Sequence, residues 1–400
     1  MSLLDKASLI VTPNAYKASK LYSVIPSDGS GDMDVVRATT ATRVNELGLI
    51  ENVGLNVPRI DYTNGGCPSI LVEPQRTNLL LRSEELNVSP WGTLGTITIT
   101  PNNTVSPDGN LTADLVLGAD SSSSVNQIIG GSTGVVYTNS FFIKNNNSTQ
   151  SALTIRNSIT AVDSRLNWSG SVLTSVTNIA GISTFKNYGN GWYRIISTYT
   201  SLETPQRPRI SPTLSTNQSV YIWGAQLEVG SNVTSYIPTV ASTVTRNADV
   251  ISKTGISGLI GQTEGTVFVD AKLSVLNTSN QQILVISDGL SVNRIRILSA
   301  SASRLRILYQ LGGSTAYDFT YSENYINLNS VKIAFTYKSG DIKIYINGNL
   351  VNTSSNTYSI SNPLIDLSIL SNGIDKGLFN SVQLYKTALT DTELIALTTI

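Results

Sequence analysis

Short runs of alternating apolar and polar residues, separated by turn residues, recur along this 400-residue chain and restrict what it can fold into. The runs Thr-Ile-Thr-Ile-Thr at 96–100 and Trp-Tyr-Arg-Ile-Ile-Ser at 192–197 are typical. A period of two places successive side chains on opposite faces, so each run predicts a β-strand with one buried face. The sequence therefore predicts an all-β fold of antiparallel β-sandwiches of the jelly-roll type.

The length of the chain and the positions of these runs predict three parts. Four hundred residues exceed one ordinary core and favour two or three domains. Residues 1–82 mix short strand-like runs with many turns and predict an N-terminal adaptor segment. Residues 83–240 and 241–400 each hold a full series of strands and predict two sandwiches that fold without that segment.

Two local signals near the C-terminus are specific. Asn347-Gly348 follows a strand-like run and predicts a tight hairpin, because both residues tolerate positive φ. Thr390 with Glu393 three residues later is a capping box, which predicts the start of one short helix.

The charge balance and hydropathy exclude several classes of partner. Lys plus Arg number 27 and Asp plus Glu number 27, so the chain lacks the basic excess of a nucleic-acid binder. No apolar run approaches the length of a membrane helix, and the N-terminus lacks the pattern of a secretory signal. We expect no nucleic-acid partner, no membrane insertion and no cleaved leader.

The residue types also limit the chemistry. The chain has 0 His and a single cysteine, Cys67, which excludes imidazole bases, His-ligated metals, cysteine metal clusters and an intrachain disulfide. Residues 28–34 (Asp-Gly-Ser-Gly-Asp-Met-Asp) offer oxygen ligands for Ca²⁺, but their spacing does not match an EF-hand loop and predicts a plain turn. We expect no metal and no cofactor.

Residues from about Gly265 to Thr399 resemble a concanavalin-A-like or laminin-G-like sandwich. The resemblance rests on the stretches 333–337 (Ile-Ala-Phe-Thr-Tyr), 344–348 (Ile-Tyr-Ile-Asn-Gly) and 382–394. The middle part, with Trp-Gly-Ala-Gln-Leu-Glu at 223–228 and Ser-Tyr-Ile-Pro-Thr at 235–239, is similar to the carbohydrate-binding-module-like jelly rolls of phage virion proteins.

The stretches 24–32 and 40–45 resemble the leading segment of phage head-fibre and tail-fibre proteins, and the connecting run with the stretches 58–62, 67–68 and 71–80 resembles a segment that recurs in them. Together the resemblance covers nearly the whole chain. It implies a virion fibre or spike, made in the host cytoplasm and carried as a homotrimer on the exterior of the phage particle. The N-terminal segment would attach to capsid or tail proteins, which would bury its apolar runs around 21–25 and 35–44. The sandwiches would project outward, for adhesion to host-surface glycans.

Concanavalin-A-like sandwiches also include glucanases, whose catalytic carboxylates follow a Glu-x-Asp-x-x-Glu pattern on one strand. This chain has no such run; Asp270 and Asp341 stand alone, and Glu84 and Glu85 would point to opposite faces of a strand. Glycosidases need two facing carboxylates. We therefore predict a protein that is not an enzyme and has no catalytic residues, with a glycan depolymerase of a tail spike as the alternative.

Five residues are candidate ligand-binding residues. Trp168 lies between Asn167 and Ser169 and is predicted to be exposed, where it could stack on a sugar ring. Trp192 and Trp223 lie within apolar runs and are predicted to be core residues. The other four candidates recur at period two on neighbouring strands and could share one face: Arg294, Arg296, Arg304 and Arg306. That face would be a basic patch for an acidic sugar or a neighbouring subunit, or else an ordinary solvated face.

Overall fold

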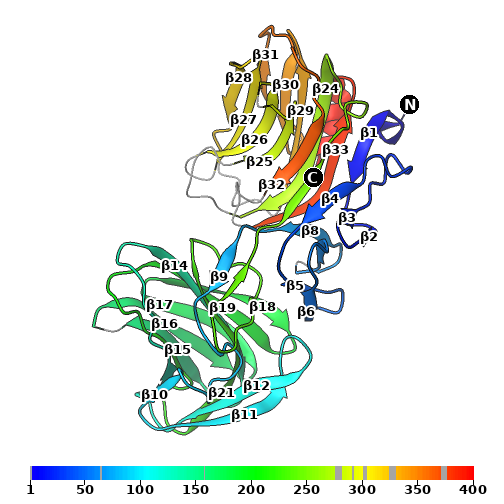
Figure 1. Ribbon diagram of the computed structural model, residues 1–400. Coiled ribbons are helices and arrows are strands. Elements are labelled where there is room, and N and C mark those ends of the chain that lie inside the picture. Colours follow the sequence, from blue (N-terminus) through cyan, green and yellow to red (C-terminus); the bar gives the residue numbers. More distant parts are fainter. Residues whose placement is uncertain are drawn as a thin grey trace. The chain divides into compact units, whose positions relative to one another are not determined.

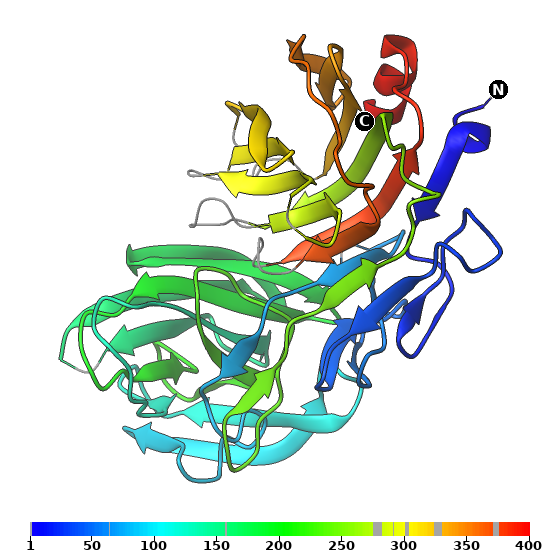
Figure 2. The same ribbon diagram turned by 45° about the horizontal axis from the view of Figure 1, so that its top comes forward.

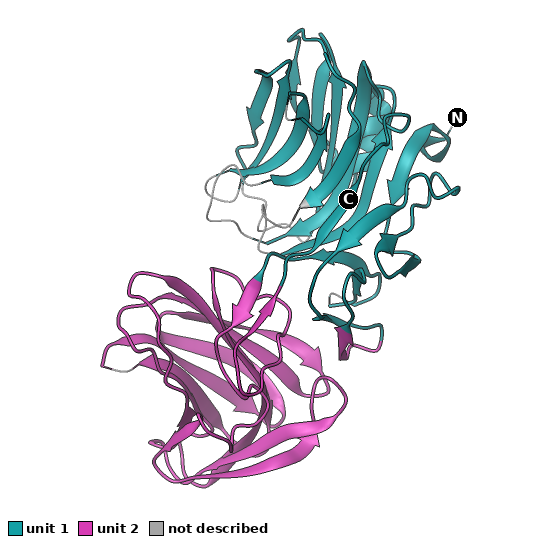
Figure 3. Cartoon of the chain, viewed as in Figure 1, with its two compact units in different colours: residues 1–46, 53–75, 247–400 teal, residues 47–52, 76–246 magenta. Residues whose placement is uncertain are grey.

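The computed structural model describes residues 2–63, 65–156, 158–274, 282–290, 292–300, 304–323, 330–370 and 376–400. These residues are almost entirely β, which confirms the predicted fold class, and their strands pair into antiparallel sheets. They form two compact units (Figure 3): unit 1 comprises residues 1–46, 53–75 and 247–400, and unit 2 comprises residues 47–52 and 76–246. No helix among the described residues is long and apolar enough to span a membrane.

Unit 1 contains two antiparallel sheets (Figure 1). The first consists of β1 (Ala7–Val11), β7 (Arg59–Asp61), β8 (Ser69–Val72), β24 (Glu264–Leu273), β29 (Val331–Lys338), β30 (Ile342–Ile346), β31 (Asn349–Ser354) and β33 (Gly377–Tyr385). The second, in spatial order, consists of β2 (Tyr16–Lys17), β3 (Lys20–Leu21), β4 (Met33–Val36), β23 (Val250–Lys253), β32 (Asp366–Leu370), β25 (Gln282–Ser287), β26 (Arg294–Ala300), β27 (Arg304–Leu311) and β28 (Ser314–Thr320).

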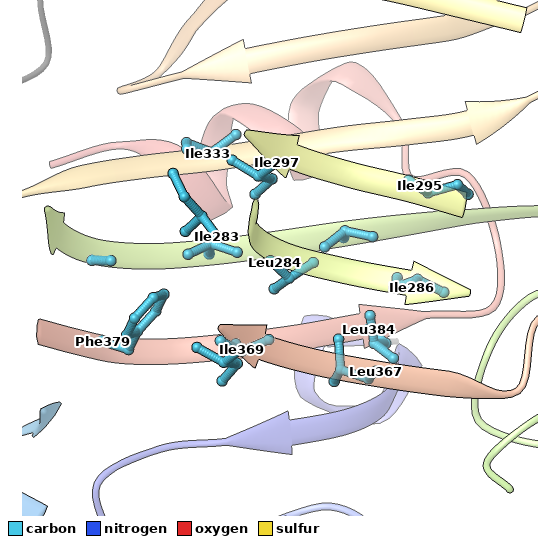
Figure 4. Packing of buried hydrophobic residues seen from close by; sticks show 14 of the residues in the cluster. Ile283, Leu284, Ile286, Ile295, Ile297, Ile333, Leu367, Ile369, Phe379 and Leu384 are labelled. Atoms are coloured by element: carbon cyan, nitrogen blue, oxygen red, sulfur yellow. The ribbon is translucent and has the colours of Figure 1, made fainter. Parts of the chain in front are cut away.

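The core of unit 1 is aliphatic and lies between these two sheets. Ile297 and Ile369 of one sheet and Phe379 and Leu384 of the other are at most 1 % exposed and belong to one packed cluster (Figure 4). Alternate residues of each strand enter this cluster, as period-two patterning requires. The hairpin predicted at Asn347-Gly348 is confirmed: Ile346 pairs with Asn349, and both turn residues have positive φ.

The N-terminal residues are part of unit 1 rather than a separate adaptor, which corrects the predicted division at 82 and 240. β1 pairs with β33, from Ala7 opposite Tyr385 to Val11 opposite Val382, and the two strands lie side by side in Figures 1 and 2. β4 pairs with β23, and β8 pairs with β33. The N-terminal residues that enter the unit 1 core are Leu9, Val11, Leu21, Met33, Val35, Ile60, Ile70 and Val72. The apolar runs of this segment are therefore buried largely within the chain itself.

A buried charge network joins the N-terminal residues to the start of the C-terminal series. Arg37, Arg59, Glu73 and Asp249 are each at most 2 % exposed. Arg37 Nη1 lies 2.9 Å from Asp249 Oδ1, Arg59 Nη1 lies 2.8 Å from Glu73 Oε2, and Arg59 also pairs with Asp249. Burial lowers the pKa of Arg59, but the attraction of Asp249 and Glu73 outweighs it, and the net pKa is raised. Two cations thus neutralise two anions.

Unit 2 contains two six-stranded antiparallel sheets. One consists of β10 (Gly92–Leu94), β13 (Ser124–Asn126), β20 (Pro208–Ser211), β15 (Gln150–Arg156), β16 (Thr160–Ser169) and β17 (Val172–Ala180). The other consists of β11 (Ile97–Val105), β12 (Leu111–Gly118), β21 (Gln218–Val229), β14 (Val136–Asn145), β19 (Trp192–Thr200) and β18 (Ile182–Gly189). One cluster of buried side chains, including Val125, Leu153, Phe141 and Ile222, draws on both sheets.

A second, aromatic cluster lies on the other face of the β14–β21 pair. Phe142 and Trp223 follow the core residues Phe141 and Ile222, so they point away from that core, and their ring centroids lie 5.4 Å apart. Tyr236 packs on Trp223 at 4.6 Å. Gly224 has φ +62°, and a Cβ there would meet Phe142 Cδ2 at 2.9 Å, so this bulged position requires glycine.

The chain enters and leaves the main part of unit 2 through adjacent strands. β9 (Arg76–Asn78) pairs with β22 (Val244–Arg246), and Arg76 stands opposite Arg246. The remaining elements are the strands β5 (Ala41–Val44) and β6 (Ile50–Val53) and the helices α1 (Leu3–Lys6) and α2 (Asp391–Thr398). The predicted capping box of α2 is confirmed, because Thr390 and Glu393 each accept from the other's backbone N–H.

Candidate ligand-binding sites

Arg294, Arg296, Arg304 and Arg306 lie on one face of the second sheet of unit 1, here called the arginine face. Arg296 stands directly opposite Leu308, and Arg306 directly opposite Leu298, so the even-numbered residues of β26 and β27 share a side. The odd-numbered residues between them enter the unit 1 core: Ile295, Ile297, Leu305 and Ile307. The four arginines therefore face away from the core, and all four are half-buried.

Hydrogen bonds hold several of these side chains along the sheet. Arg294 and Arg296 both donate through Nη2 to Gln310 Oε1, at 3.0 and 3.1 Å. Gln310 is a neutral acceptor, so these two bonds leave both positive charges in place. Arg306 instead donates from Nε to Asp318 Oδ1 at 2.7 Å and forms a second bond to Oδ2, a bidentate ion pair.

The positive charges repel one another at close range. The pKa of Arg296 is lowered by burial and by the neighbouring charges of Arg294 and Arg306. The Nε atoms of Arg294 and Arg296 are buried and make no hydrogen bond to any described residue. Three apolar side chains on the same face are buried beside the cations, namely Leu298 at 1 %, Leu308 at 8 % and Val285 at 7 % exposed. This face thus combines cationic hydrogen-bond donors with buried leucine and valine side chains.

The prediction that Trp168 is exposed is wrong. Trp168 is 8 % exposed, its Nε1 donates to Ser151 Oγ at 3.0 Å, and its ring packs edge-on against Tyr193 at 5.8 Å. Burial in the unit 2 core leaves no ring face for a sugar. Trp192 and Trp223, at 3 % and 1 % exposed, are buried as predicted, and Trp223 lies in the aromatic cluster with Phe142 and Tyr236.

The acidic run at 28–34 forms a hydrogen-bonded turn. Asp28 Oδ1 accepts from the backbone N–H of Ser30 at 2.8 Å, and Asp32 Oδ1 accepts from the N–H of Ser23 at 3.0 Å. Among the described residues, no group of three or more acidic or cysteine side chains is arranged to hold a metal ion.

Unit 2 contains a cavity of about 480 Å³ that the sequence does not predict. Its walls come from a turn at 84–88, from β11 and β12, and from the segment 238–240; the lining residues are Glu84, Glu85, Asn87, Val88, Pro101, Asn102, Thr112, Asp114, Pro238, Thr239 and Val240. Glu84 and Glu85 lie in a turn rather than on a strand. The only signal in the sequence is the adjacent pair Glu84 and Glu85. Such a pair does not predict which other segments form the walls of a cavity.

The carboxylates of this cavity have protein partners. Asp114 Oδ2 accepts from the N–H of Leu86 at 2.8 Å, and its Oδ1 from the N–H of Asn102 at 3.1 Å. Glu84 Oε1 accepts from the hydroxyl of Tyr236 at 2.9 Å. Burial raises the pKa of both Glu84 and Asp114, and the hydrogen bonds that they accept oppose that rise.

Comparison with known proteins identifies one domain. Residues 252–395 match the family model of the concanavalin A-like lectin/glucanases superfamily, in agreement with the concanavalin-A-like or laminin-G-like sandwich that the motifs of this segment predicted. No curated protein is significantly similar in sequence to the chain.

Two of the similar solved structures are a carbohydrate-binding module and a neurotoxin. The CBM40 of the Ruminococcus gnavus IT-sialidase, solved with α2,3-sialyllactose, is 18 % identical, with a TM-score of 0.29, over 35 % of this chain and 84 % of that one. Botulinum neurotoxin type C, whose cell entry depends on two ganglioside molecules, is 14 % identical, with a TM-score of 0.32, over 38 % of this chain and 40 % of that one.

Proposed function

We propose that this chain is a non-catalytic phage virion protein, a head or tail fibre on the particle exterior, whose concanavalin A-like domain binds acidic host-surface glycans through the arginine face. The observation that carries the binding role is the convergence of Arg294, Arg296, Arg304 and Arg306 on one face directed away from the core. The resemblance of the chain to phage fibre proteins supports the virion role.

Acidic glycans fit the chemistry of this face. A guanidinium group presents a planar fork of donors that matches carboxylate and sulfate geometry. Gln310 is fixed between Arg294 and Arg296 and offers an amide that can bond sugar hydroxyls. Leu298 and Leu308 are buried beneath the arginines, where their low-polarity surroundings strengthen charge-assisted hydrogen bonds to a ligand.

The placement of acids on this face favours binding over hydrolysis. Asp366 and Asp318 flank the arginines on β32 and β28, which are four strands apart in the sheet. At about 4.8 Å per strand, the two backbones are separated by roughly 19 Å. Glycosidases hold their two carboxylates about 5–9.5 Å apart, so these two acids do not form a catalytic pair.

Replacing Arg294 and Arg296 together with alanine is expected to weaken binding of the full chain to acidic glycans by at least about tenfold, since each charge-assisted hydrogen bond contributes roughly 1.5–3 kcal/mol. Binding should also weaken as salt is raised, because exposed charges are screened. A glycan array followed by calorimetry on the bound acidic glycan measures both effects.

Arg165→Ala is the matched control, because Arg165 is also half-buried but lies on β16 of unit 2. It should leave acidic-glycan binding unchanged. Equal binding by the double variant and the unaltered protein would refute the assigned surface, and new reducing ends appearing in the bound glycan would refute the non-catalytic role.

The virion role has an independent test. Antibody-labelled electron microscopy should place the protein on the exterior of intact phage particles, and native mass measurement should give a homotrimer. Particles without label, together with a stable monomer in solution, would contradict the fibre assignment while leaving the arginine face to be judged by the glycan experiment.

A further inference from the structure

The cavity of unit 2 has walls that are fixed before any ligand arrives. Asp114 ties the turn that carries Leu86 to the strand that carries Asn102 by accepting both backbone N–H groups. Thr239 is held by its N–H to Ser83 Oγ at 2.9 Å and by its hydroxyl to the carbonyl of Leu80 at 2.6 Å. A site with fixed walls loses little conformational entropy on binding. Its volume of about 480 Å³ lies within the range of small-molecule sites.

The charges of the lining residues exclude an anionic ligand. Glu84, Glu85 and Asp114 line the cavity, and none of the lining residues is a lysine or arginine. An acidic sugar would bring a further negative charge beside these groups without a cation to compensate it. This cavity therefore disfavours the acidic glycans that the arginine face is proposed to bind.

The carboxylates also do not form a metal site. Glu85 pairs with Arg82 at 2.7 Å, Glu84 accepts from Tyr236, and both oxygens of Asp114 accept backbone N–H groups. The described residues hold no cluster of three acids suited to a metal ion. Each carboxylate keeps unused lone pairs, which suit the hydroxyl groups of a polyol.

The rest of the lining combines polar and apolar groups, which match the hydroxyl and C–H groups of a sugar ring. Asn87, Asn102 and Thr112 provide amide and hydroxyl groups, each of which can donate and accept hydrogen bonds. Val88, Pro101, Pro238 and Val240 provide the apolar surface. From the fixed walls, the mixed lining and the absence of a lining cation, we infer that this cavity is a second glycan site that binds a neutral hexose.

Filling the cavity with Val88→Trp is expected to abolish binding of neutral hexoses to the full chain. Saturation-transfer NMR with D-glucose, D-galactose, D-mannose and N-acetylglucosamine, each at millimolar concentration, provides the measurement. The unaltered protein should bind at least one of these sugars, and D-glucuronic acid should bind more weakly than D-glucose. Val105→Trp is the control, because Val105 is 52 % exposed on β11 and does not line the cavity.

Two milder variants separate the ligand classes. Asn87→Ala should weaken neutral-hexose binding by about tenfold, the loss expected for one hydrogen bond. Glu84→Gln should leave it within about threefold, because the amide still bonds hydroxyl groups, whereas a cationic ligand would lose its charge partner. Binding of none of the four hexoses, equal binding of glucuronic acid, or unchanged binding by Val88→Trp would each overturn the inference. The Arg294/Arg296 double variant should bind the hexose normally, so this result is independent of the arginine face.

Discussion

Replacing Asp249 with alanine is expected to lower the free energy of unfolding of unit 1 by about 3–5 kcal/mol, the usual cost of removing one partner from a buried ion pair. Asp249 pairs with both Arg37 and Arg59 and accepts the N–H of Glu73 at 2.9 Å. Its removal would leave two buried guanidinium groups with only Glu73 as an anion of the network. Calorimetry of the full chain should show the transition of unit 1 at lower temperature and that of unit 2 unchanged.

The matched control is Asp318→Ala, which removes an ion pair from the surface of the same unit. Asp318 and its partner Arg306 have side chains that are 38 % and 25 % exposed. Exposed pairs contribute less than about 1 kcal/mol. A loss of stability from Asp249→Ala no greater than that from Asp318→Ala would show that the buried network does not stabilise unit 1.

Removing residues 1–46 is expected to unfold unit 1 altogether. The deletion takes away Arg37 and five core side chains that are at most 2 % exposed: Leu9, Val11, Leu21, Met33 and Val35. At roughly 1.5–3 kcal/mol for each buried side chain, the loss is comparable with the about 5–15 kcal/mol that stabilises a typical domain. Unit 2 should remain folded, so a calorimetric scan should show only the unfolding transition of unit 2.

A shorter deletion provides the control for this truncation. Residues 1–6 include α1, which has no buried residue, and their removal leaves β1 in place. That protein should keep both transitions. If unit 1 stayed folded without residues 1–46, these residues would be a separable adaptor, as the sequence predicted.

The strands were predictable from sequence because their signals are local. Period-two alternation, the Asn347-Gly348 turn and the Thr390 cap each depend on residues within a few positions of one another. The division of the chain was not predictable, because it depends on pairings between residues as distant as Ala7 and Tyr385. Nothing in the run Ala-Ser-Leu-Ile-Val at 7–11 indicates which strand completes it.

The candidate sites show the same limit. The arginine pattern gave a shared face because alternation and adjacency are enough to define one. The expected exposure of Trp168 is wrong because polar neighbours on a strand do not indicate that the residue between them is exposed. On a strand, polar residues at 167 and 169 point to the face opposite 168, so they favour burial of the tryptophan between them. The cavity in unit 2 forms where three separate segments of the chain meet, and no single stretch of sequence predicts that meeting.

The insertion of unit 2 between the strands of unit 1 sets the order of folding during synthesis. The main part of unit 2 is continuous from 76 to 246, and its two ends meet in the β9–β22 pair, so it can fold as soon as it leaves the ribosome. Unit 1 folds later, since β33, which pairs with both β1 and β8, is made only after unit 2. Until then the apolar N-terminal strands have unpaired edges, the condition that promotes aggregation. We therefore expect residues 1–75 of the nascent chain to be prone to aggregation until β33 has been made.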